Sequence, residues 1–390
     1  MESWRKNIPL WLIIVLLIFL GLIFAAWLWQ VSSTTNLGNG DFVGYWSATY
    51  LLHNGLNPYD PQLMENLQHT QMQTGLTSTI MAWNPPVLFV VLLPLAWLPF
   101  AIAKFVWLMV NITIILAASL MLARLYLPEN NYKVLLFFLL FAVSLPQVIS
   151  GIFIGQVTFL VFFGLVVCLM LIKKGQWFWA GAVLILTTIK PHLVILSVIY
   201  LLLYMAQRRQ YLGWVGLIVA GTACALVLFI FRSSWIQDLM GELKISPVHW
   251  LTPTIGGLFS YFGVSDIARY LIVLLLPLPF ILLRYQAAIK LELAVALLTL
   301  ITVPTTFFGW SYDQTILLIP IAQVFGWLNL SKDKASNAWF VFAIALGLAG
   351  IFFQHFFTRN DVFYLWFPLF WWFIFGLKWR HVSKIASVAT

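Results

Sequence analysis

Charged side chains are scarce in this chain. Only 8% of its 390 residues are charged, whereas 62% are hydrophobic, and these include 33 Phe and 20 Trp. Soluble globular domains carry about a quarter charged residues, so this composition excludes a soluble domain and indicates a protein embedded in a lipid bilayer. The formal net charge of +9 comes without a basic stripe or an RNA-binding motif. We therefore expect no nucleic-acid partner.

Cysteine is almost absent as well. Cys168 and Cys224 are the only two, and both lie within apolar runs. The sequence thus excludes a disulfide framework and a cysteine-based metal site. We expect no cofactor and no bound metal. A divalent ion shared by Asp41, Asp60 and Asp313 is the alternative that the sequence leaves open.

Apolar runs of membrane length, by contrast, fill most of the chain. A helix of about twenty residues spans the hydrocarbon core. The candidate segments are 8–30, 85–99, 101–124, 134–154, 155–172, 177–189, 190–206, 211–231, 267–283, 289–304, 313–329, 338–356 and 362–377. We expect one all-α membrane domain over residues 1–390, with about 11–13 transmembrane helices. The first run is long for a signal-peptide core, so we expect a retained helix.

The basic residues assign the two sides of the membrane, because Lys and Arg are enriched in cytoplasmic loops. Thirteen of the 21 basic residues form the set that we place there: Arg5, Lys6, Lys173, Lys174, Arg208, Arg209, Arg284, Lys290, Lys332, Lys334, Lys378, Arg380 and Lys384. Segments 31–83, which has no Lys or Arg, and 232–265 are then outer loops. We expect a multi-pass protein of the cell membrane (inner or plasma), with both termini cytoplasmic.

One apolar run is inconsistent with the regular alternation of sides between successive crossings. If 134–154 crosses fully, Lys173 and Lys174 fall on the wrong side. Pro146 and Gly151 interrupt that run, so the sequence favours a short or re-entrant hairpin. Irregular backbone survives at membrane depth only where protein or a wet cavity satisfies it.

The first outer loop holds an acidic residue in an unusual setting. Asp41 follows the first crossing, and Phe42, Tyr45, Trp46 and Leu52 recur after it at helical spacing. This pattern predicts an amphipathic helix along the membrane interface. A single carboxylate among aromatic and amide side chains is our candidate reactive group. The alternative, of equal weight for a lone aspartate, is that Asp41 only caps the helix.

Lys190 is the second prominent polar residue. It lies between two continuous apolar runs, 177–189 and 193–204. An ionisable group in that setting is costly and by default functional. Contact with a phosphate would offset its desolvation. The alternative is a snorkelling lysine at a helix end.

Other polar residues have competing structural interpretations. The Asn-Pro-Tyr-Asp sequence at 57–60 is typical of a turn, and Trp-Asn-Pro-Pro at 83–86 of a helix entry. Gln156 at a membrane helix end more often bonds neighbouring backbone than a substrate, and a lone His192 is more often a packed residue. Residues 309–314 again combine aromatics with a carboxylate at the outer mouth of an apolar helix.

An ordered set of short motifs connects these pieces. They are Asp-Phe-x-x-Tyr-Trp-x-Ala at 41–48, Gly-x-Asn-Pro-Tyr at 55–59, Trp-x-Pro-Pro at 83–86, Gly155-Gln156, Ala180-Gly181 leading to Lys190-Pro191, and Ser-Tyr-Asp at 311–313 before Leu-Leu-Ile-Pro at 317–320. No single motif is specific, but the set in this order resembles the polyprenyl-phosphate-sugar-dependent GT-C glycosyltransferases, specifically glycosyltransferase family 87. The resemblance runs from about Leu28 to Pro320.

The resemblance implies a GT-C bundle with its active site on the non-cytoplasmic, periplasmic face. It also implies a sugar donor carried on polyprenyl phosphate and a catalytic aspartate in the first outer loop, the position of Asp41. One departure is that many similar proteins carry a His pair where this chain has Gln314-Thr315. Lys190 and His192 are our candidates to replace that pair.

The chemistry expected from this resemblance is transfer of a hexose or pentose, with mannose as one candidate, to a glycolipid or polysaccharide acceptor. Asp41 would act as general base with inversion. The lack of a glycine-rich phosphate loop argues against a nucleotide-sugar donor. The substrate-binding candidates are Tyr45, Trp46, Asn57, Tyr59, Asp60, Trp83, Asn84, Gln156, Lys190, His192, Tyr312, Asp313 and Gln314.

A second class of function fits many of the same features. A multi-pass transporter or flippase for a lipid-linked or small polar substrate would also have many helices and an intramembrane lysine. It predicts inverted repeats and charged residues at mid-membrane. We see no repeat, and the polar residues cluster toward one face, so the transferase is favoured over the transporter.

Overall fold

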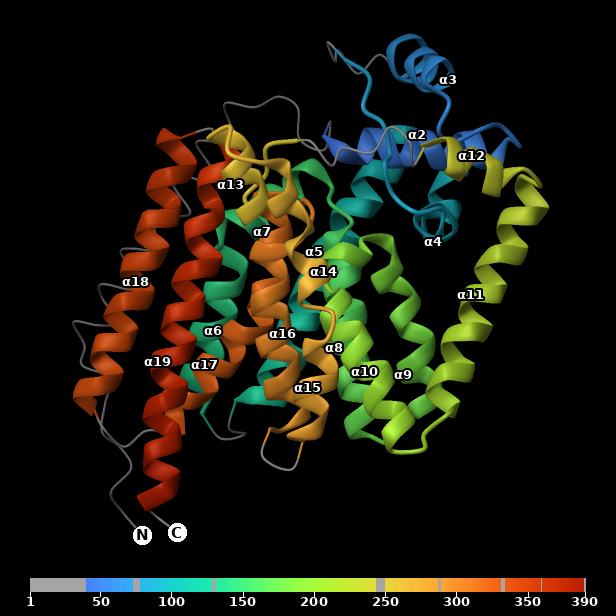
Figure 1. Cartoon of the computed structure of the whole chain (residues 1–390). Coiled ribbons are helices and arrows are strands. Elements are labelled where there is room, and N and C mark those ends of the chain that lie inside the picture. Colours follow the sequence, from blue (N-terminus) through green and yellow to red (C-terminus); the bar gives the residue numbers. More distant parts are fainter. Residues whose placement is uncertain are drawn as a thin grey trace.

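A computed structural model describes residues 40–72, 78–127, 131–242, 250–286, 289–330, 334–358 and 360–388. Every regular element in these ranges is helical, and together they form an upright bundle (Figure 1). The expected first crossing, 8–30, lies outside the described residues. The all-α fold agrees with the sequence-based expectation.

Two groups of elements make up the bundle. Short helices lie at one end: α2 (Asp41–His53), α3 (Pro61–Asn66), η1 (Leu67–Gln71), α4 (Val87–Ala96), α12 (Trp235–Glu242) and α13 (Ile255–Tyr261). The upright passes are α5 (Phe100–Tyr126), α6 (Tyr132–Ser144) with α7 (Pro146–Ile154), α8 (Thr158–Lys173), α9 (Trp177–Val183) with η2 (Leu184–Ile189), η3 (Pro191–Leu193) with α10 (Ile195–Gln207), α11 (Leu212–Phe231), η6 (Asp266–Tyr270) with α14 (Leu271–Leu274) and α15 (Leu278–Arg284), α16 (Leu291–Thr305), η7 (Ser311–Leu317) with α17 (Leu318–Leu330), α18 (Lys334–Phe357), and η8 (Asp361–Leu365) with α19 (Trp366–Val388).

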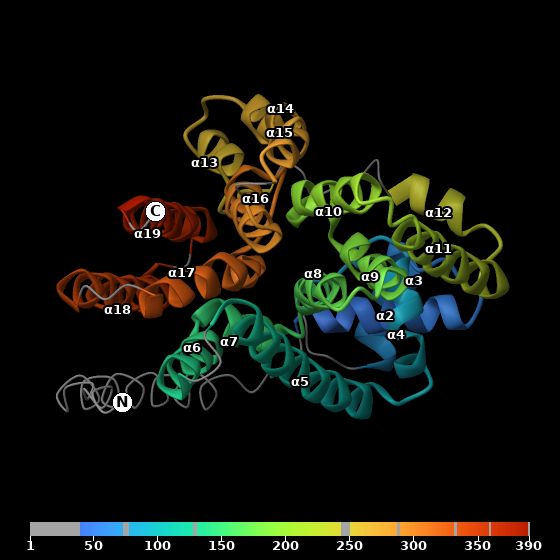
Figure 2. The same cartoon turned by 90° about the horizontal axis from the view of Figure 1, so that it is seen from below.

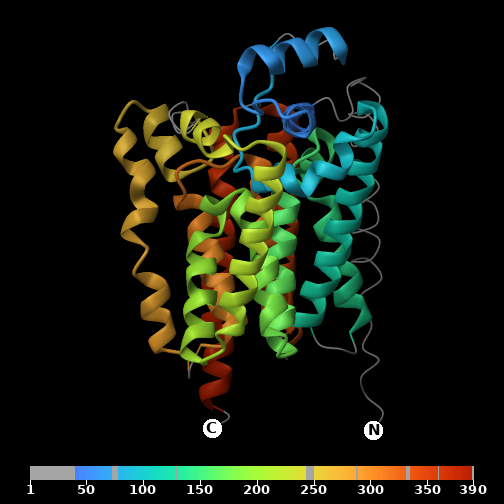
Figure 3. The same cartoon turned by 90° about the vertical axis from the view of Figure 1, so that its right-hand side faces the viewer.

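Contacts between elements define the two ends of the bundle. At the site end, α5 begins against α2, and the Phe42 and Phe100 rings stack with centroids 6.2 Å apart. At the opposite end, the Tyr126 hydroxyl donates a 3.1 Å hydrogen bond to the Glu292 carbonyl oxygen, and Lys173 forms a 2.6 Å ion pair with the Glu292 carboxylate. Figure 3 shows α2 and α3 lying across the site end of the upright helices.

Several passes have the length and composition of membrane spans. Among the described residues, five helices are long and apolar enough to cross a bilayer, or six if the bent α6–α7 pair counts as one span. Shorter apolar helices of 10–17 residues make up other passes. Outward apolar side chains such as Leu226 and Ile230 on α11 are exposed, as suits contact with lipid. The protein is thus a multi-pass membrane protein, and the count of 11–13 spans stays a prediction.

The segment 134–154 forms a bent pass, so the predicted re-entrant hairpin was wrong. Pro146 begins α7 directly after α6, since proline fits the first turn of a helix but not its interior. The two helices bend by 50°. Figure 1 shows α6 nearer the opposite end and α7 nearer the site end. The chain therefore crosses the bundle here.

The segment 85–99, which we expected to cross, stays at the site end. At its start, the Asn84 side-chain amide donates a 3.2 Å hydrogen bond to the Ile189 carbonyl oxygen. At its far end, the Trp46 indole of α2 donates a 3.0 Å bond to the Leu95 carbonyl oxygen. The expected crossing was wrong because both ends of the segment are held at the site end. Removing it restores the alternation of sides between successive crossings. The connections at the opposite end then carry Lys173, Lys174, Arg208, Arg209, Arg284 and Lys290.

α2 is a buried helix and not the amphipathic surface helix that the spacing predicted. Residues 42–49 are all buried. The Trp46 ring packs edge-on against Phe100 at 5.5 Å, and Phe42 stacks on Trp107 at 5.8 Å. The prediction was wrong because α4 and α5 cover the faces of α2 that a surface helix would turn to the headgroups.

Small residues bring neighbouring passes into close contact. A Cβ atom at Gly181 of α9 would overlap the Gly213 carbonyl oxygen of α11, and one at Gly216 would overlap the Phe178 carbonyl oxygen. Membrane helices use such small residues to approach closely and gain dispersion contacts. Figure 2 shows α9 beside α11, with α8 between α9 and α5. This contact fixes α9 and, through η2, the position of Lys190.

Candidate active site

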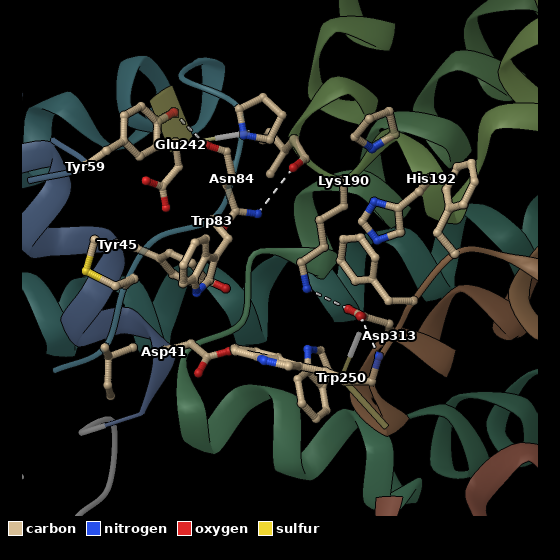
Figure 4. Close-up of a pocket in the computed structure, with 18 of the residues that line it drawn as sticks. Asp41, Tyr45, Tyr59, Trp83, Asn84, Lys190, His192, Glu242, Trp250 and Asp313 are labelled. Carbon is tan, nitrogen blue, oxygen red and sulfur yellow. Dashed lines mark hydrogen bonds and ion pairs between the residues drawn. The ribbon is translucent and has the colours of Figure 1, made fainter. Parts of the chain in front are cut away.

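A cavity of about 580 Å³ opens at the site end (Figure 4). It is bounded by α2, the segment 79–85, the η2–η3 connection, α12 and the segment 307–313. Its lining residues are Asp41, Tyr45, Tyr59, Thr79, Ile80, Met81, Trp83, Asn84, Pro85, Ile189, Lys190, Pro191, His192, Leu239, Glu242, Trp250, Phe307, Phe308, Trp310, Tyr312 and Asp313. Segments that lie far apart between residues 41 and 313 therefore contribute to one hollow.

Asp41 lines this cavity from the first turn of α2. Gly40 is the N-cap residue, and no side chain caps the helix. The capping interpretation of Asp41 was therefore wrong. Its Oδ2 atom instead accepts a hydrogen bond from the Gln156 amide and one of 3.2 Å from the Tyr312 hydroxyl. Burial raises the pKa of Asp41 above its ordinary value, and the charge of Lys190 partly offsets that rise.

Lys190 lies at the base of the cavity between η2 and η3, and its ammonium is buried. Its Nζ atom lies 2.7 Å from Oδ1 of Asp313, 3.0 Å from Oε1 of Gln156 and 3.0 Å from Oγ1 of Thr158. An ammonium has three donors, so protein acceptors satisfy all of them. The snorkelling interpretation was wrong, because a snorkelling ammonium would reach solvent. Lys190 also lies over the Tyr312 ring, 5.2 Å from its centroid.

Gln156 joins Asp41 and Lys190 into one network. Its amide nitrogen donates to Asp41, while its Oε1 accepts from Lys190 and, at 3.4 Å, from the Tyr45 hydroxyl. The expectation that Gln156 bonds neighbouring backbone was therefore wrong. Gln156 is fully buried, and buried networks of this kind are rigid when every polar group has a partner.

Glycine at position 155 makes this placement of Gln156 possible. Gly155 ends α7 with φ of 74°, a conformation that costs other residues energy. A Cβ atom at this position would lie 2.5 Å from Cβ of Phe42. The Trp107 indole donates a 2.8 Å hydrogen bond to the Gly155 carbonyl oxygen. The tight turn between α7 and α8 thus brings Gln156 against α2.

Asp313 is held by both backbone and side chains. The Trp310 backbone N–H donates a 2.9 Å hydrogen bond to its Oδ2 atom, and the Thr158 hydroxyl donates to Oδ1. Asp313 is 2% exposed, so its main partner is the Lys190 ammonium and not solvent. A buried ion pair of this kind is stable only when further hydrogen bonds satisfy the remaining groups.

Aromatic rings form one wall of the cavity. Trp83 meets Trp250 edge-on at 6.3 Å, Trp250 meets Trp310 at 5.3 Å, and Trp310 stacks with Tyr312 at 6.3 Å. Flat aromatic faces of this size provide large apolar contact area with a polar edge. Such a wall suits the apolar face of a sugar ring.

His192 lies at the edge of the cavity, where its ring packs 4.2 Å from the centroid of Phe308. Its Nε2 atom is buried and has no hydrogen-bond partner among the described residues. The expectation of a packed histidine agrees with this contact.

Some predicted site residues do not line the cavity. Trp46 packs under α4, and Gln314 donates a 3.0 Å hydrogen bond to the Tyr364 carbonyl oxygen. Asn57 accepts a 2.9 Å bond from the Tyr59 backbone N–H, and Asp60 caps α3 by accepting from the backbone N–H groups of residues 62 and 63. The turn interpretation of residues 57–60 was therefore correct.

Tyr59 and Asn84 line the cavity but also bind protein groups. The Tyr59 hydroxyl donates a 2.9 Å hydrogen bond to the Asn84 carbonyl oxygen, and the Asn84 amide donates to Ile189 as described above. Trp83 meets the cavity from the same segment. Tyr59 and the segment 83–85 are thus adjacent in space, and together they close one side of the cavity.

Several lining residues were missed by sequence reasoning. Glu242 ends α12, while Trp250 and Trp310 come from the outer segments before α13 and η7. The available signal was their composition, since an acid and two tryptophans in outer loops repeat the pattern seen around Asp41. Nothing local shows that these loops fold back over the same hollow.

A shared metal site is not evident in the described residues. No group of three or more His, Cys, Asp or Glu side chains among them is placed to hold a metal ion. In the alternative that the sequence left open, Asp60 would join Asp41 and Asp313. Asp60 instead caps α3.

The model of glycosyltransferase family 87 matches residues 83–289, more than half of the chain. The chain belongs to this family. No curated protein and no solved structure matches it. The protein is therefore a membrane glycosyltransferase. The matched range of this family 87 enzyme includes Gln156, Lys190 and Glu242, while Asp41 and Asp313 lie on either side of it.

Proposed function

We propose that this family 87 protein transfers a sugar from a polyprenyl-phosphate donor to a hydroxyl of a glycolipid or polysaccharide, with inversion at the anomeric carbon. The sugar is a hexose or a pentose, and mannose is one candidate. The membrane embedding of the chain and its lack of a glycine-rich phosphate loop support a donor presented from the bilayer.

The observation that carries this proposal is the placement of Asp41. Its carboxylate faces a cavity of about 580 Å³ with a wall of tryptophans. A single amide, Gln156, connects it to Lys190, the one cationic side chain among the described lining residues. A base and a cation joined in this way suit a reaction in which a proton leaves one atom while negative charge develops on a neighbouring group.

The proposed step balances as a single displacement. The acceptor oxygen forms a bond to the anomeric carbon and its proton passes to Asp41, while the bond from the anomeric carbon to the phosphate oxygen breaks. The polyprenyl phosphate leaves with the electron pair. The hydrogen bonds from Gln156 and Tyr312 both end on Oδ2 of Asp41, so we assign Oδ1 to the acceptor hydroxyl. General-base catalysis contributes about a hundred- to ten-thousand-fold.

Lys190 is the group that we assign to the leaving phosphate. Its three donors are satisfied by Asp313, Gln156 and Thr158, so a phosphate oxygen would replace the Thr158 hydroxyl or the Gln156 amide oxygen. A phosphate contact with an ammonium is stronger than a contact with a neutral acceptor. The His192 ring packs against Phe308, and the charge of Lys190 makes it the stronger candidate for this role.

The positions of basic residues support an orientation. The connections at the opposite end carry the basic residues given above, and such residues are enriched on the cytoplasmic side. We therefore propose that the site end faces away from the cytoplasm. Transport of a substrate would require a path that reaches both ends of the bundle. The polar cluster and the cavity lie at one end only within the described residues, which favours transfer over transport.

The test compares two aspartates of the same loop. Purified Asp41→Asn and Asp60→Asn variants are assayed with labelled polyprenyl-phosphate mannose and with other polyprenyl-phosphate hexoses and pentoses, in membranes from the native host as the acceptor source. We expect Asp41→Asn to lose at least a hundredfold in transfer, while Asp60→Asn keeps wild-type activity because asparagine also caps helices. Undiminished transfer by Asp41→Asn, in protein that elutes and unfolds like wild type, would overturn the assignment. Vesicle transport that survives Asp41→Asn would support the transporter.

A further inference from the structure

Glu242 is a carboxylate in the cavity wall that the proposed step does not use. It is the last residue of α12 and is 8% exposed. Its Oε1 atom has no hydrogen-bond partner among the described residues. Figure 4 shows the carboxylate beside Tyr59 and away from the Lys190–Asp313 ion pair. A buried carboxylate oxygen without a partner is costly, and this cost points to a ligand.

The position of Glu242 is fixed by contacts elsewhere on α12. Arg232, just before α12, forms a 2.7 Å ion pair with Asp238. The same guanidinium donates a 3.0 Å hydrogen bond to the Gly55 carbonyl oxygen, which lies in the turn after α2. α12 is thereby tied to the loop that carries Asp41. The carboxylate is held in a defined place in the cavity.

The chemistry of Glu242 determines what it can bind. A carboxylate only accepts hydrogen bonds, so it binds hydroxyl or amine donors and repels a phosphate. The indole of Trp83 lies in the same part of the cavity and meets Trp250 at 6.3 Å. A carboxylate beside an aromatic face suits a sugar ring, which offers hydroxyls at its edge and C–H groups on its face.

The reaction geometry assigns this sugar to the acceptor. In a displacement with inversion, the phosphate and the acceptor oxygen lie on opposite sides of the anomeric carbon. If Lys190 holds the phosphate, the acceptor lies on the side away from Lys190, which is where Glu242 lies. We infer that Glu242 binds hydroxyls of the acceptor beside the one that attacks, so that the acceptor is a sugar residue with several hydroxyls and not a simple alcohol or a serine. This inference rests on the proposed function.

The test measures binding as well as transfer. Glu242→Gln keeps the size of the side chain but replaces one carboxylate oxygen by an NH₂ group. Glu65→Gln, on α3 outside the cavity, is the matched control. Methyl glycosides of hexoses and pentoses serve as probes, with cyclohexanol as the monohydroxyl comparison. Titration calorimetry follows binding, and labelled polyprenyl-phosphate sugars follow transfer.

We expect Glu242→Gln to weaken methyl glycoside binding about tenfold or more, since hydrogen bonds to charged groups are among the stronger ones. The acceptor KM should rise by a similar factor while the donor KM stays unchanged. Cyclohexanol binding should be the same in both proteins, and Glu65→Gln should match wild type.

The inference would be overturned by unchanged glycoside binding in Glu242→Gln, by a rise in the donor KM alone, or by equal weakening of glycoside and cyclohexanol binding. Unfolding midpoints of Glu242→Gln and Glu242→Ala separate a binding defect from a folding defect, and an affinity loss confined to variants that unfold early counts against the inference. A wild-type protein that binds methyl glycosides but transfers nothing from any polyprenyl-phosphate sugar would contradict the proposed function instead.

Discussion

Asp41 and Asp60 lie in the same loop, each at the start of a helix, yet their carboxylates bind different partners. Asp60 accepts hydrogen bonds of 2.9 and 3.1 Å from the backbone N–H groups of residues 62 and 63, and so caps α3. Asp41 caps nothing, and its carboxylate accepts hydrogen bonds from Gln156 and Tyr312. For Asp41 the sequence left a helix cap and a reactive group equally open, whereas for residues 57–60 it favoured a turn.

The difference comes from what each carboxylate meets in space. The nearest strong donors to Asp60 are those of its own helix, and its carboxylate stays near solvent. Asp41 meets side chains that are 115 and 271 residues away in the chain, and burial raises its pKa. A carboxylate with a raised pKa is a stronger base when ionised, which suits proton abstraction.

The largest expected effect is on stability, and it should come from removing Lys190, the cation beside Asp41. In Lys190→Met, the buried Asp313 carboxylate loses its charged partner, and breaking a buried ion pair in this way costs about 3–5 kcal/mol. We expect that loss in equilibrium denaturation in detergent micelles. The Asp41 carboxyl should also lose the Lys190 charge that lowers its pKa.

The double variant Lys190→Met with Asp313→Asn is the control, since it removes both charges together. It should recover a large part of the lost stability, because no uncompensated charge stays buried. Stability of the single variant equal to that of wild type would show that the ion pair is not buried in the way described.

A smaller effect should follow from removing the Gln156 amide, which bridges Asp41 and Lys190. In Gln156→Leu, Asp41 loses a hydrogen bond that favours its ionised form, so its pKa should rise further. The base must be ionised to act, and the acid limb of the kcat/KM profile should therefore move to higher pH. Transfer measured across pH in wild type and variant checks this shift.

Wild type itself should lose activity as the pH falls through the pKa of Asp41, at a pH above the ordinary range of an aspartate. A Gln314→Leu variant is the matched comparison, because Gln314 is a buried amide outside the cavity. An acid limb that stays in place in Gln156→Leu, or one that moves equally in Gln314→Leu, would disprove the role given to the bridge.

The smallest effect should come from the capping aspartate. Asp60→Ala removes the cap of α3, and loss of such a cap costs about 0.5–2 kcal/mol. We expect a lower unfolding midpoint with unchanged kcat and KM for transfer. A loss of activity larger than the loss of folded protein would place Asp60 in the site and break the contrast with Asp41.

The local sequence pattern predicted the fold class and the family of this chain, but it also led to identifiable errors. Hydropathy predicted an all-α membrane protein, and the ordered motifs indicated the family that the chain belongs to. The same pattern counted 85–99 as a crossing and 134–154 as a hairpin. Hydropathy registers whether a segment is apolar, but it cannot register whether both its ends are tied to the same end of the bundle, as α4 is through Asn84 and Trp46.

The sequence by itself determined that the chain is embedded in a lipid bilayer. It also determined which residue types are available to form a site. Scarce charge and long apolar runs require a bilayer, and a polar group such as Lys190 must then find a partner. Only the tertiary structure decided which partners meet. Gln156 joins Asp41 to Lys190, and Glu242 reaches the same cavity, because passes distant in the chain pack side by side. Such long-range convergence follows from packing and burial of the whole bundle, which no local stretch encodes.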